Sequence, residues 1–314
     1  MRKLIAVLAV AVLAAGCGQV ADDAEAPTGP TVSTRFGDVT VPAEAKRVVA
    51  LGWSDAETAL ALGVSPIAAS DWLAFGGEGV GPWAAGLYSA PPKLVGTQEL
   101  NYDDLYALKP DLILNTRSDN SKEVYDELTK IAPTVSAPEE VTVAYGTTWR
   151  QQMELVSAAL NKKSEGDKLI AEVDEKLESA KSPAFADKTV AVGAHFSDQY
   201  GAYVRGDSRA DLMESLGFTV KPEIQELATD SFYVQLSREQ VELLDADLTV
   251  VFPIGSDAAV LRADRVLNQI PSALAGHLVI LDDLDLINAF SSGSTLGTLY
   301  AVENAVPLFA GALG

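Results

Sequence analysis

SEGDKLIAEVDEKLESAKS, residues 164–182, is the stretch that decides how this chain is organised. Its apolar residues recur at helical spacing along one stripe: Leu169, Ile170, Val173 and Leu177. A helix of about 18 residues is roughly 27 Å long, and this one stands between two halves that each alternate strands with helices. We therefore predict a stiff helix linking two lobes, with a cleft between them. The alternative is a surface helix of one continuous domain.

The half before this helix alternates short apolar runs with amphipathic segments. KRVVALG (46–52) has the pattern of a buried strand, and SDAETALALGV (54–64) follows as a helix. Ser54 and Glu57 open that helix with the spacing of a capping box. NYDDLYALKPDLILNT (101–116) repeats the scheme of helix, proline break and strand. Helices between successive strands imply crossover connections, and so a mostly parallel sheet.

The half after the long helix follows the same scheme. KTVAVGAHF (188–196) and HLVILDD (277–283) are predicted strands, and SRADLMESLGF (208–218) is a predicted helix. SREQVELLDADLTVVFP (237–253) is predicted to form a capped helix that leads into a further strand, and residues 297–313 a closing helix. The fold class predicted for the whole chain is α/β, with two lobes of mostly parallel sheets, a single long joining helix and a ligand cleft between the lobes.

The N-terminus has the layout of a secretory signal that ends on the single cysteine of the chain. Arg2 and Lys3 precede an apolar run of about 12 residues, which is too short for a spanning helix of roughly 20. Small residues then lead directly to Cys17. This layout resembles a bacterial lipobox, although Ala14 stands where Leu is commoner, and it implies lipidation of Cys17. The alternative is an ordinary signal peptide with an incidental cysteine.

These patterns predict five consecutive segments. Residues 18–34 are rich in Gly, Pro and acidic residues and are expected to form a flexible linker, because they cannot bury enough apolar surface to offset their ordering entropy. The predicted boundaries are 1–17 for the signal peptide, 18–34 for the linker, 35–150 for the N-terminal lobe, 151–182 for the connecting helices and 183–314 for the C-terminal lobe.

Composition excludes several classes of function. A formal net charge of −21 argues against a nucleic-acid partner, since phosphate contacts need Lys and Arg. One cysteine allows no internal disulfide and no cysteine-based metal site. The two histidines, His195 and His277, are too few for a zinc site of the usual kind, so no metal site and no resident cofactor are predicted. The chain contains no G-x-S-x-G elbow, P-loop or G-x-G-x-x-G fingerprint after a strand, and we do not expect an enzyme.

Several segments in order carry a resemblance to a known family: KRVVALGWSDAETALALGVSPIAAS, NYDDLYALKPDLILNTRSDNSKEVYDELTKIAPTV, the long middle helix, ADLMESLGFTV, LSREQVELLDADLTVVF and HLVILDD. Together they resemble the ferric-siderophore and cobalamin group of solute-binding proteins of ABC importers, over residues 35 to 314. The resemblance implies a shallow cleft, little lobe movement, capture of an iron(III)-siderophore outside the membrane and its delivery to an ABC permease. It implies a monomer that does no chemistry on its ligand and is anchored to the cell membrane through Cys17. Haem or cobalamin is the alternative ligand, with His195 or Tyr200 as a possible axial ligand to haem.

The same resemblance implies one docking carboxylate on each lobe, facing arginines of the permease. The motif positions are Asp103, where the family usually has Glu, and Glu239 in the SREQ segment. Glu99 and Asp104 are neighbours that could replace Asp103. Exposed carboxylates of this kind steer an encounter and fix its register. The alternative is that acidic residues stand in the first turn of a helix because they favour its dipole.

Candidate ligand contacts follow from residue type and position. Ligands of open α/β lobes sit beyond the carboxyl ends of strands, and a ferric siderophore needs aromatic faces and a few donors, chiefly Arg. The resemblance further places the loop of Phe232 and Tyr233 at the cleft. The predicted contacts are Trp53, Trp72, Arg117, Tyr145, Trp149, Tyr203, Arg205, Phe232 and Tyr233. The alternatives are core positions for the tryptophans and solvated surface positions for the arginines.

Overall fold

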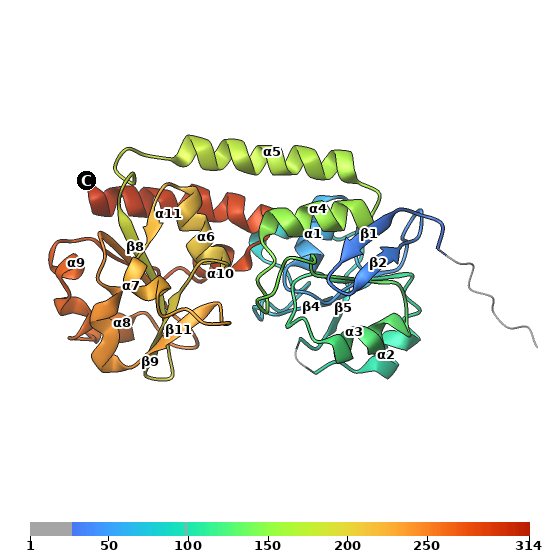
Figure 1. Ribbon diagram of the computed structural model, residues 1–314, viewed down its shortest axis with the longest axis horizontal. Helices are drawn as coiled ribbons and strands as arrows, with labels where there is room; N and C mark the ends of the chain where they lie inside the picture. Colours follow the sequence, from blue (N-terminus) through green and yellow to red (C-terminus); the bar gives the residue numbers. More distant parts are fainter. Residues whose placement is uncertain (1–26, 98) are drawn as a thin grey trace, which may run out of the picture.

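Two sheets form the centres of two lobes that lie side by side in the computed structural model (Figure 1). The structure describes residues 27–97 and 99–314. The predicted signal peptide, its Cys17 and the first part of the predicted linker lie outside the described residues. The remaining architecture matches the predicted class: two α/β lobes with a long helix across both.

The first lobe is built on a five-stranded sheet in the order β5-β4-β3-β6-β7, and every neighbouring pair is parallel. Its central strands β3 and β6 are buried throughout, which is expected of a parallel sheet covered on both faces. The elements of this lobe are β1 (Thr31–Thr34), β2 (Gly37–Thr40), β3 (Val48–Ala50), α1 (Asp55–Ala61), β4 (Ala68–Ser70), η1 (Pro82–Ala84), β5 (Lys93–Val95), α2 (Tyr102–Ala107), β6 (Leu112–Asn115), α3 (Lys122–Thr129) and β7 (Thr134–Ser136).

A β-hairpin precedes this sheet and corrects the predicted linker boundary. Strands β1 and β2 pair antiparallel, so residues 31–34 belong to the folded lobe and not to a flexible segment. Val32 is buried in the lobe's core, and the backbone N–H of Arg35 donates to the carbonyl of Ala137. The strand could not be recognised from the sequence, because its four residues include a single large apolar side chain.

The second lobe contains a six-stranded mixed sheet in the order β11-β9-β8-β12-β13, with β10 also paired to β8. The pairs of β8 with β12 and β10, and of β12 with β13, are parallel, whereas β9 pairs antiparallel with β8 and β11. The elements are β8 (Thr189–Phe196), β9 (Gln199–Tyr203), α6 (Ser208–Ser215), β10 (Thr219–Val220), α7 (Pro222–Gln225), β11 (Tyr233–Leu236), η2 (Arg238–Leu244), β12 (Leu248–Pro253), α8 (Ala259–Ala263), η3 (Leu267–Gln269), α9 (Pro271–Leu274), β13 (Leu278–Ile280), α10 (Leu284–Ser292) and α11 (Thr295–Leu313).

The antiparallel strands come from a tight turn that the sequence patterns did not predict. Ser197 and Asp198 connect β8 to β9, and both have positive φ angles of 46° and 61°. A two-residue hairpin loop of this kind needs φ above zero at both positions. Ser-Asp is not the usual Asn-Gly or Asp-Gly signal, so the hairpin was missed.

Helix α5 (Lys163–Ala180) extends over both lobes as predicted, preceded by α4 (Trp149–Ala159) (Figure 1). Its apolar stripe is shared between two cores: Ile170 packs in the core of the first lobe, and Val173 and Leu177 pack in that of the second. Trp149 packs against both cores. The stripe thus fixes the helix to each lobe.

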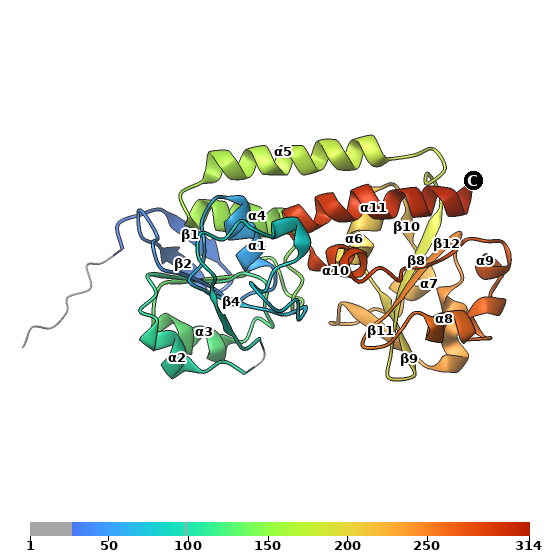
Figure 2. The same cartoon turned by 180° about the vertical axis from the view of Figure 1, so that it is seen from behind.

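The C-terminal helix α11 reinforces this junction. It lies alongside α5 and also packs against α1 of the first lobe (Figure 2). In the described part of the chain it is the one helix long and apolar enough to cross a membrane by length and composition. Ala301, Val302, Ala305 and Phe309 are nevertheless buried in the core of the second lobe, so here α11 serves as a core helix.

Candidate functional site

A cleft of about 440 Å³ opens between the two lobes. Its wall on the first lobe comes from the loops after β3 and β4, and its wall on the second from β9, the end of β12, and α10. The lining residues are Trp53, Trp72, Leu73, Ala74, Tyr203, Arg209, Phe232, Phe252, Pro253, Ile254, Gly255, Leu284, Ile287, Asn288 and Ser291. Strand ends therefore supply much of the cleft, as the sequence argument predicted for an open α/β sheet.

Three stacked aromatic rings stand beside the cleft on the first lobe, and two of them, Trp53 and Trp72, line it. The ring of Trp53 lies between Trp72, with centroids 4.1 Å apart and planes 7° apart, and Tyr145, at 3.9 Å and 23°. Tyr145 adopts a left-handed backbone with φ of 59°. Its N–H donates to the carbonyl of Ser118 at 2.7 Å, and its own carbonyl accepts from Nε of Arg117 at 3.0 Å. These bonds hold Tyr145 against the tryptophan pair.

The wall on the second lobe is also aromatic. Phe232 meets Tyr145 edge to face at 6.4 Å, so the two aromatic walls approach each other at this point. Tyr203 stacks with Phe252 at 6.0 Å. Asn288 and Ser291 of α10 add neutral polar groups to the lining. The cleft can therefore enclose a rounded ligand with an apolar rim and offer it a few hydrogen bonds.

A second hollow, of about 350 Å³, adjoins the aromatic stack within the first lobe. It shares Trp53 with the cleft and brings Tyr145 and Arg117 to its lining. The full lining is Leu51, Trp53, Thr97, Leu100, Tyr102, Asn115, Arg117, Ser118, Asp119, Val124 and Tyr145. Six of the predicted contacts thus gather around one aromatic stack: Trp53, Trp72, Arg117, Tyr145, Tyr203 and Phe232.

Arg117 is a buried bridge between the lobes as well as part of this lining. Its side chain is only 2% exposed, which excludes the solvated surface position considered above. Besides the bond to Tyr145, Nη1 donates to the carbonyl of Ser292 at 2.7 Å and Nη2 to Oγ of Ser208 at 3.2 Å. Burial lowers the pKa of Arg117 to about 10. The guanidinium also lies 5.9 Å from the ring centres of Trp53 and Trp72.

Ser54 and Glu57 bridge the lobes too, and the capping box predicted for them is wrong. Ser54 has a positive φ of 64° and makes no side-chain cap. Its Oγ donates instead to the carbonyl of Ser292 at 2.6 Å. The carboxylate of Glu57 accepts from Oγ of Ser294, the N-cap of α11. Burial raises the pKa of Glu57. Partners more than 230 positions away therefore replace the local cap.

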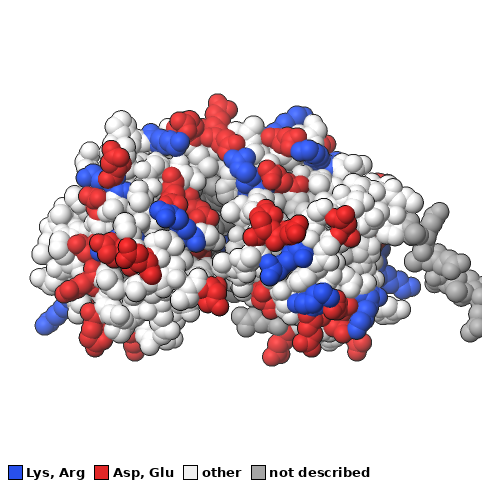
Figure 3. Space-filling model, viewed as in Figure 1, with Lys and Arg blue, Asp and Glu red and all other residues white. Residues whose placement is uncertain are grey.

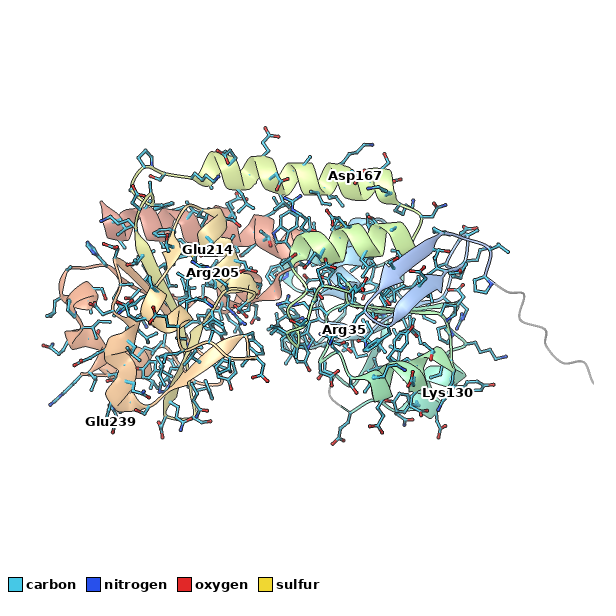
Figure 4. The ribbon with its side chains drawn as sticks, viewed as in Figure 1. Arg35, Lys130, Asp167, Arg205, Glu214 and Glu239 are labelled. Atoms are coloured by element: carbon cyan, nitrogen blue, oxygen red, sulfur yellow. The ribbon has the colours of Figure 1, made fainter. Side chains whose placement is uncertain are left out.

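Three of the predicted contacts lie away from the aromatic stack. Trp149 lines a separate hollow beneath α5, of about 720 Å³. Nε of Arg205 donates to the carboxylate of Glu214 at 2.7 Å, and both residues stand on the second lobe in Figure 4. Tyr233 follows Phe232 and packs edge to face on Phe196 at 6.3 Å.

The two predicted docking carboxylates are both exposed. Asp103 stands in the first turn of α2, and Glu239 in the first turn of η2. Glu239 lies at the lower end of its lobe in Figure 4, and α2 lies at the lower end of the other lobe in Figure 1. Glu239 and helix α2, which carries Asp103, thus lie at the same end of the two lobes. In Figure 3, acidic side chains are frequent along the lower edges of both lobes.

Some residues that line the cleft were not predicted from the sequence. Arg209 stands in the first turn of α6, where it reads as an ordinary surface residue, and Phe252 lies inside a strand. The part of the lining that comes from α10 could have been predicted from the sequence. Its four residues have the i, i+3, i+4, i+7 spacing of one helix face: Leu284, Ile287, Asn288 and Ser291.

The described residues also bear on metal and haem binding. Within 27–97 and 99–314, no three His, Cys, Asp or Glu side chains gather as a metal site would require. His195 and Tyr200 line a small hollow of about 200 Å³ at the β8–β9 hairpin, and neither lines the aromatic cleft. Oη of Tyr200 donates to the carboxylate of Asp264 at 2.9 Å, and burial raises the pKa of the phenol.

The chain is similar in sequence and structure to several known proteins. The profile of the family described as periplasmic binding protein matches residues 48–284. A protein of Bacillus subtilis named probable siderophore-binding lipoprotein YfiY is 31% identical over 230 residues, which cover 70% of this chain and 67% of that protein. A periplasmic solute-binding protein from Mycobacterium smegmatis is 26% identical, with a TM-score of 0.78 over 91% of this chain and 99% of the other. PiaA of Streptococcus pneumoniae in complex with ferrichrome is also 26% identical, with a TM-score of 0.76 over the same shares.

Proposed function

The chain belongs to the periplasmic binding protein family, and from that premise we propose that it captures an iron(III)-siderophore complex and delivers it, as a monomer, to an ABC permease. The observation that carries the proposal is the stack of Trp72, Trp53 and Tyr145, whose two tryptophans line the cleft between the two lobes. Stacked rings offer a rigid apolar surface at low entropic cost, which suits the apolar periphery of a chelated iron complex.

The relatives favour the same ligand class. The Bacillus subtilis relative is named as siderophore-binding, and the pneumococcal structure holds ferrichrome. Binding followed by release needs no reaction on the ligand, so we propose no enzymatic activity. We expect each binding cycle to end with transfer of the intact complex to the permease.

We place this function outside the cytoplasmic membrane. The relative's name describes a lipoprotein, and the signal-like N-terminus ends on Cys17. Acylation of Cys17 would hold the body near the permease through the segment that follows. Asp103 and Glu239 are exposed, and α2 lies at the same end of its lobe as Glu239 does of the other. The two carboxylates would then meet basic groups of the permease.

Haem or cobalamin is the second candidate, since an aromatic cleft also suits a flat macrocycle. Axial ligation of haem by Tyr200 is disfavoured because its hydroxyl is buried and engaged with Asp264. Neither His195 nor Tyr200 lines the cleft. The aromatic stack therefore supports the ferric siderophore more strongly.

A thermal-unfolding panel tests the proposal. The purified protein is heated with a ferric hydroxamate, a ferric catecholate, ferric citrate, haemin or cobalamin, and with each chelator free of iron. A ligand that binds the folded state raises the Tm in proportion to the logarithm of its concentration. We expect a rise with at least one ferric siderophore and none with its iron-free form. A rise with haemin or cobalamin alone would move the function to the second candidate.

A further inference from the structure

The charges that line the cleft are few. Of the described residues that line the cleft and the adjoining hollow, three are charged: Arg209, Arg117 and Asp119. Arg209 is 6% exposed and holds its guanidinium 3.7 Å from the ring centre of Tyr203. Asp119 is exposed at the edge of the hollow. Arg209 lines the cleft itself, whereas Arg117 and Asp119 line the adjoining hollow. The two arginines are therefore the cations that could favour a negatively charged ligand.

Arg209 is neutralised where it stands. Its Nε and Nη2 donate to the two carboxylate oxygens of Asp207 at 2.8 and 2.7 Å, which makes a bidentate ion pair. Asp207 is itself only 3% exposed. Burial alone would lower the pKa of Arg209, but the carboxylate of Asp207 raises it above its usual value. The guanidinium therefore stays charged, and its charge is cancelled by a fixed partner.

The positive charge of Arg117 is offset by carboxylates around it, and its donors are engaged within the protein. Its Nε, Nη1 and Nη2 each donate to an acceptor within the protein: Tyr145, Ser292 and Ser208. Besides Arg209, the charged groups around it are Asp207, Asp211 and Asp55. Two arginines thus stand among three aspartates. The charged groups around the two arginines therefore leave no excess of positive charge beside the cleft.

From this balance we propose that the cleft selects ferric complexes without net negative charge, and that Asp207 sets the selectivity by neutralising Arg209. The proposal rests on the proposed function and names the ligand class within it. Three hydroxamates, each carrying one negative charge, balance Fe³⁺ and leave the iron centre neutral. Three catecholates carry six charges and leave the complex with three negative charges. Moving that trianion from water into the cleft costs desolvation free energy, and no unpaired cation in the cleft is available to offset this cost.

The rest of the lining fits a neutral complex. The amide of Asn288 and the hydroxyl of Ser291 can donate to hydroxamate oxygens, and the aromatic walls cover the apolar periphery. The formal net charge of −21 adds a long-range repulsion against anions. The neutral donors of the lining and the net charge of the chain therefore both favour a complex without net negative charge.

Calorimetric titration of the purified protein with a ferric tris-hydroxamate and a ferric tris-catecholate tests this proposal. We expect the tris-hydroxamate to bind roughly 100-fold or more tightly than the tris-catecholate at low salt. The Kd of the neutral complex should not change with salt, because no net charge is screened. Equal or tighter binding of the tris-catecholate would overturn the inference and leave the proposed function intact. Binding of neither complex, nor of ferric citrate, would overturn the proposed function and the inference with it.

Asp207→Asn tests the residue itself. The side-chain oxygen of Asn can still cap α6, as Asp207 does by accepting from the N–H of Arg209. The variant frees the charge of Arg209, so the ratio of the two Kd values should narrow about tenfold. An unchanged ratio in a folded variant would overturn the role of Asp207.

A substitution at the exposed edge of the cleft provides a second test if Asp207→Asn does not fold. Leu284 lines the cleft and is 69% exposed, so Leu284→Lys adds a cation there without burying it. We expect a few-fold gain in affinity for the tris-catecholate at low salt, which disappears at high salt. Leu274→Lys is the matched control, since Leu274 is 67% exposed on α9 and does not line the cleft. An equal gain in both variants would show a general charge effect and would contradict a cleft that excludes anions by its own charge balance.

Discussion

Nη1 of Arg117 donates to the carbonyl oxygen of Ser292 across 2.7 Å and thereby joins the loop after β6 to the end of α10. Ser54 donates to the same carbonyl from the first lobe, at 2.6 Å. Glu57 and Ser294 add a further bond between the lobes immediately beyond α10. The cleft is therefore set by a buried polar junction as well as by α5 and α11, and its aromatic walls are held in register by that junction.

Arg117→Lys should destabilise the protein strongly. Lysine lacks the planar fork that reaches three acceptors at once, so the carbonyl of Tyr145 loses this donor and that of Ser292 keeps only Ser54. We expect the free energy of unfolding to fall by about 2–4 kcal/mol, measured by denaturant unfolding. Arg262→Lys is the control, because Arg262 forms an exposed pair with Asp282 and should change the free energy by less than about 0.5 kcal/mol. A loss for Arg117→Lys as small as that of the control would contradict a structural junction at this residue.

Ser294→Ala should cost more than an ordinary helix cap. Oγ of Ser294 accepts from the N–H of Gly297 and donates to Oε2 of Glu57. Its removal leaves the helix end without its cap and Oε2 of a buried side chain without this donor. We expect a loss of about 2–3 kcal/mol in the free energy of unfolding. Ser121→Ala removes only the cap of α3 and should cost about 1 kcal/mol. Equal losses in the two variants would show that the bond between the lobes contributes nothing.

Asp211→Asn should stabilise the protein in a pH-dependent way. Burial, with repulsion from Asp207 and Glu214, raises the pKa of Asp211 to about 6. Between about pH 4 and 6 the folded state then holds more protons than the unfolded state, so the wild-type protein loses stability as the pH rises through this window. The stability gained by the variant should grow from near zero at pH 4 to about 1–2 kcal/mol at pH 7.5.

Denaturant unfolding at a series of pH values measures that gain. Asp230→Asn, at an exposed position, is the matched control and should show no such growth with pH. A gain for Asp211→Asn that stayed constant from pH 4 to 7.5 would rule out titration of Asp211 in this window.

Trp53→Ala should weaken ligand binding, because it removes the central ring of the stack and releases Trp72 and Tyr145 together. We expect the Kd for the ferric complex to rise by about 10- to 100-fold, which corresponds to the loss of one buried aromatic anchor. Tyr106→Ala, at an exposed position on α2 outside the cleft, should leave the Kd unchanged. Calorimetry on both variants makes the comparison, and an unchanged Kd for Trp53→Ala would exclude the stack as the binding surface.

Much of the fold could be predicted because its signals are local. The stripe of Ile170, Val173 and Leu177 determines the face that α5 buries, and periodicity alone reveals it. The proline-terminated helix before β6 and the run of buried strand residues after it predict a crossover in the same way. These elements formed close to the expected bounds.

The missed features depend on residues that are distant in sequence. The partner of Glu57 lies 237 positions away, and its bond replaces the local capping box. Burial of Arg117 follows from α10 of the other lobe, which no local pattern reports. Arg209 and Asp207 stand two positions apart, as in many surface loops, and become a buried pair only when Tyr203 packs over them. The aromatic side of the site was thus predictable from residue type, whereas its charge balance was not.

The most direct test of the central claim is a tryptophan-fluorescence titration of the protein with a ferric tris-hydroxamate, using the iron-free chelator as the control. Trp53 and Trp72 stand in the cleft wall, so a bound iron complex lies beside both indoles. We predict saturable quenching by the ferric complex, no saturable response to the iron-free chelator, and loss of most of the quenching in Trp53→Ala. Equal responses to the ferric and iron-free forms, or no saturation by any ferric siderophore, would contradict this prediction.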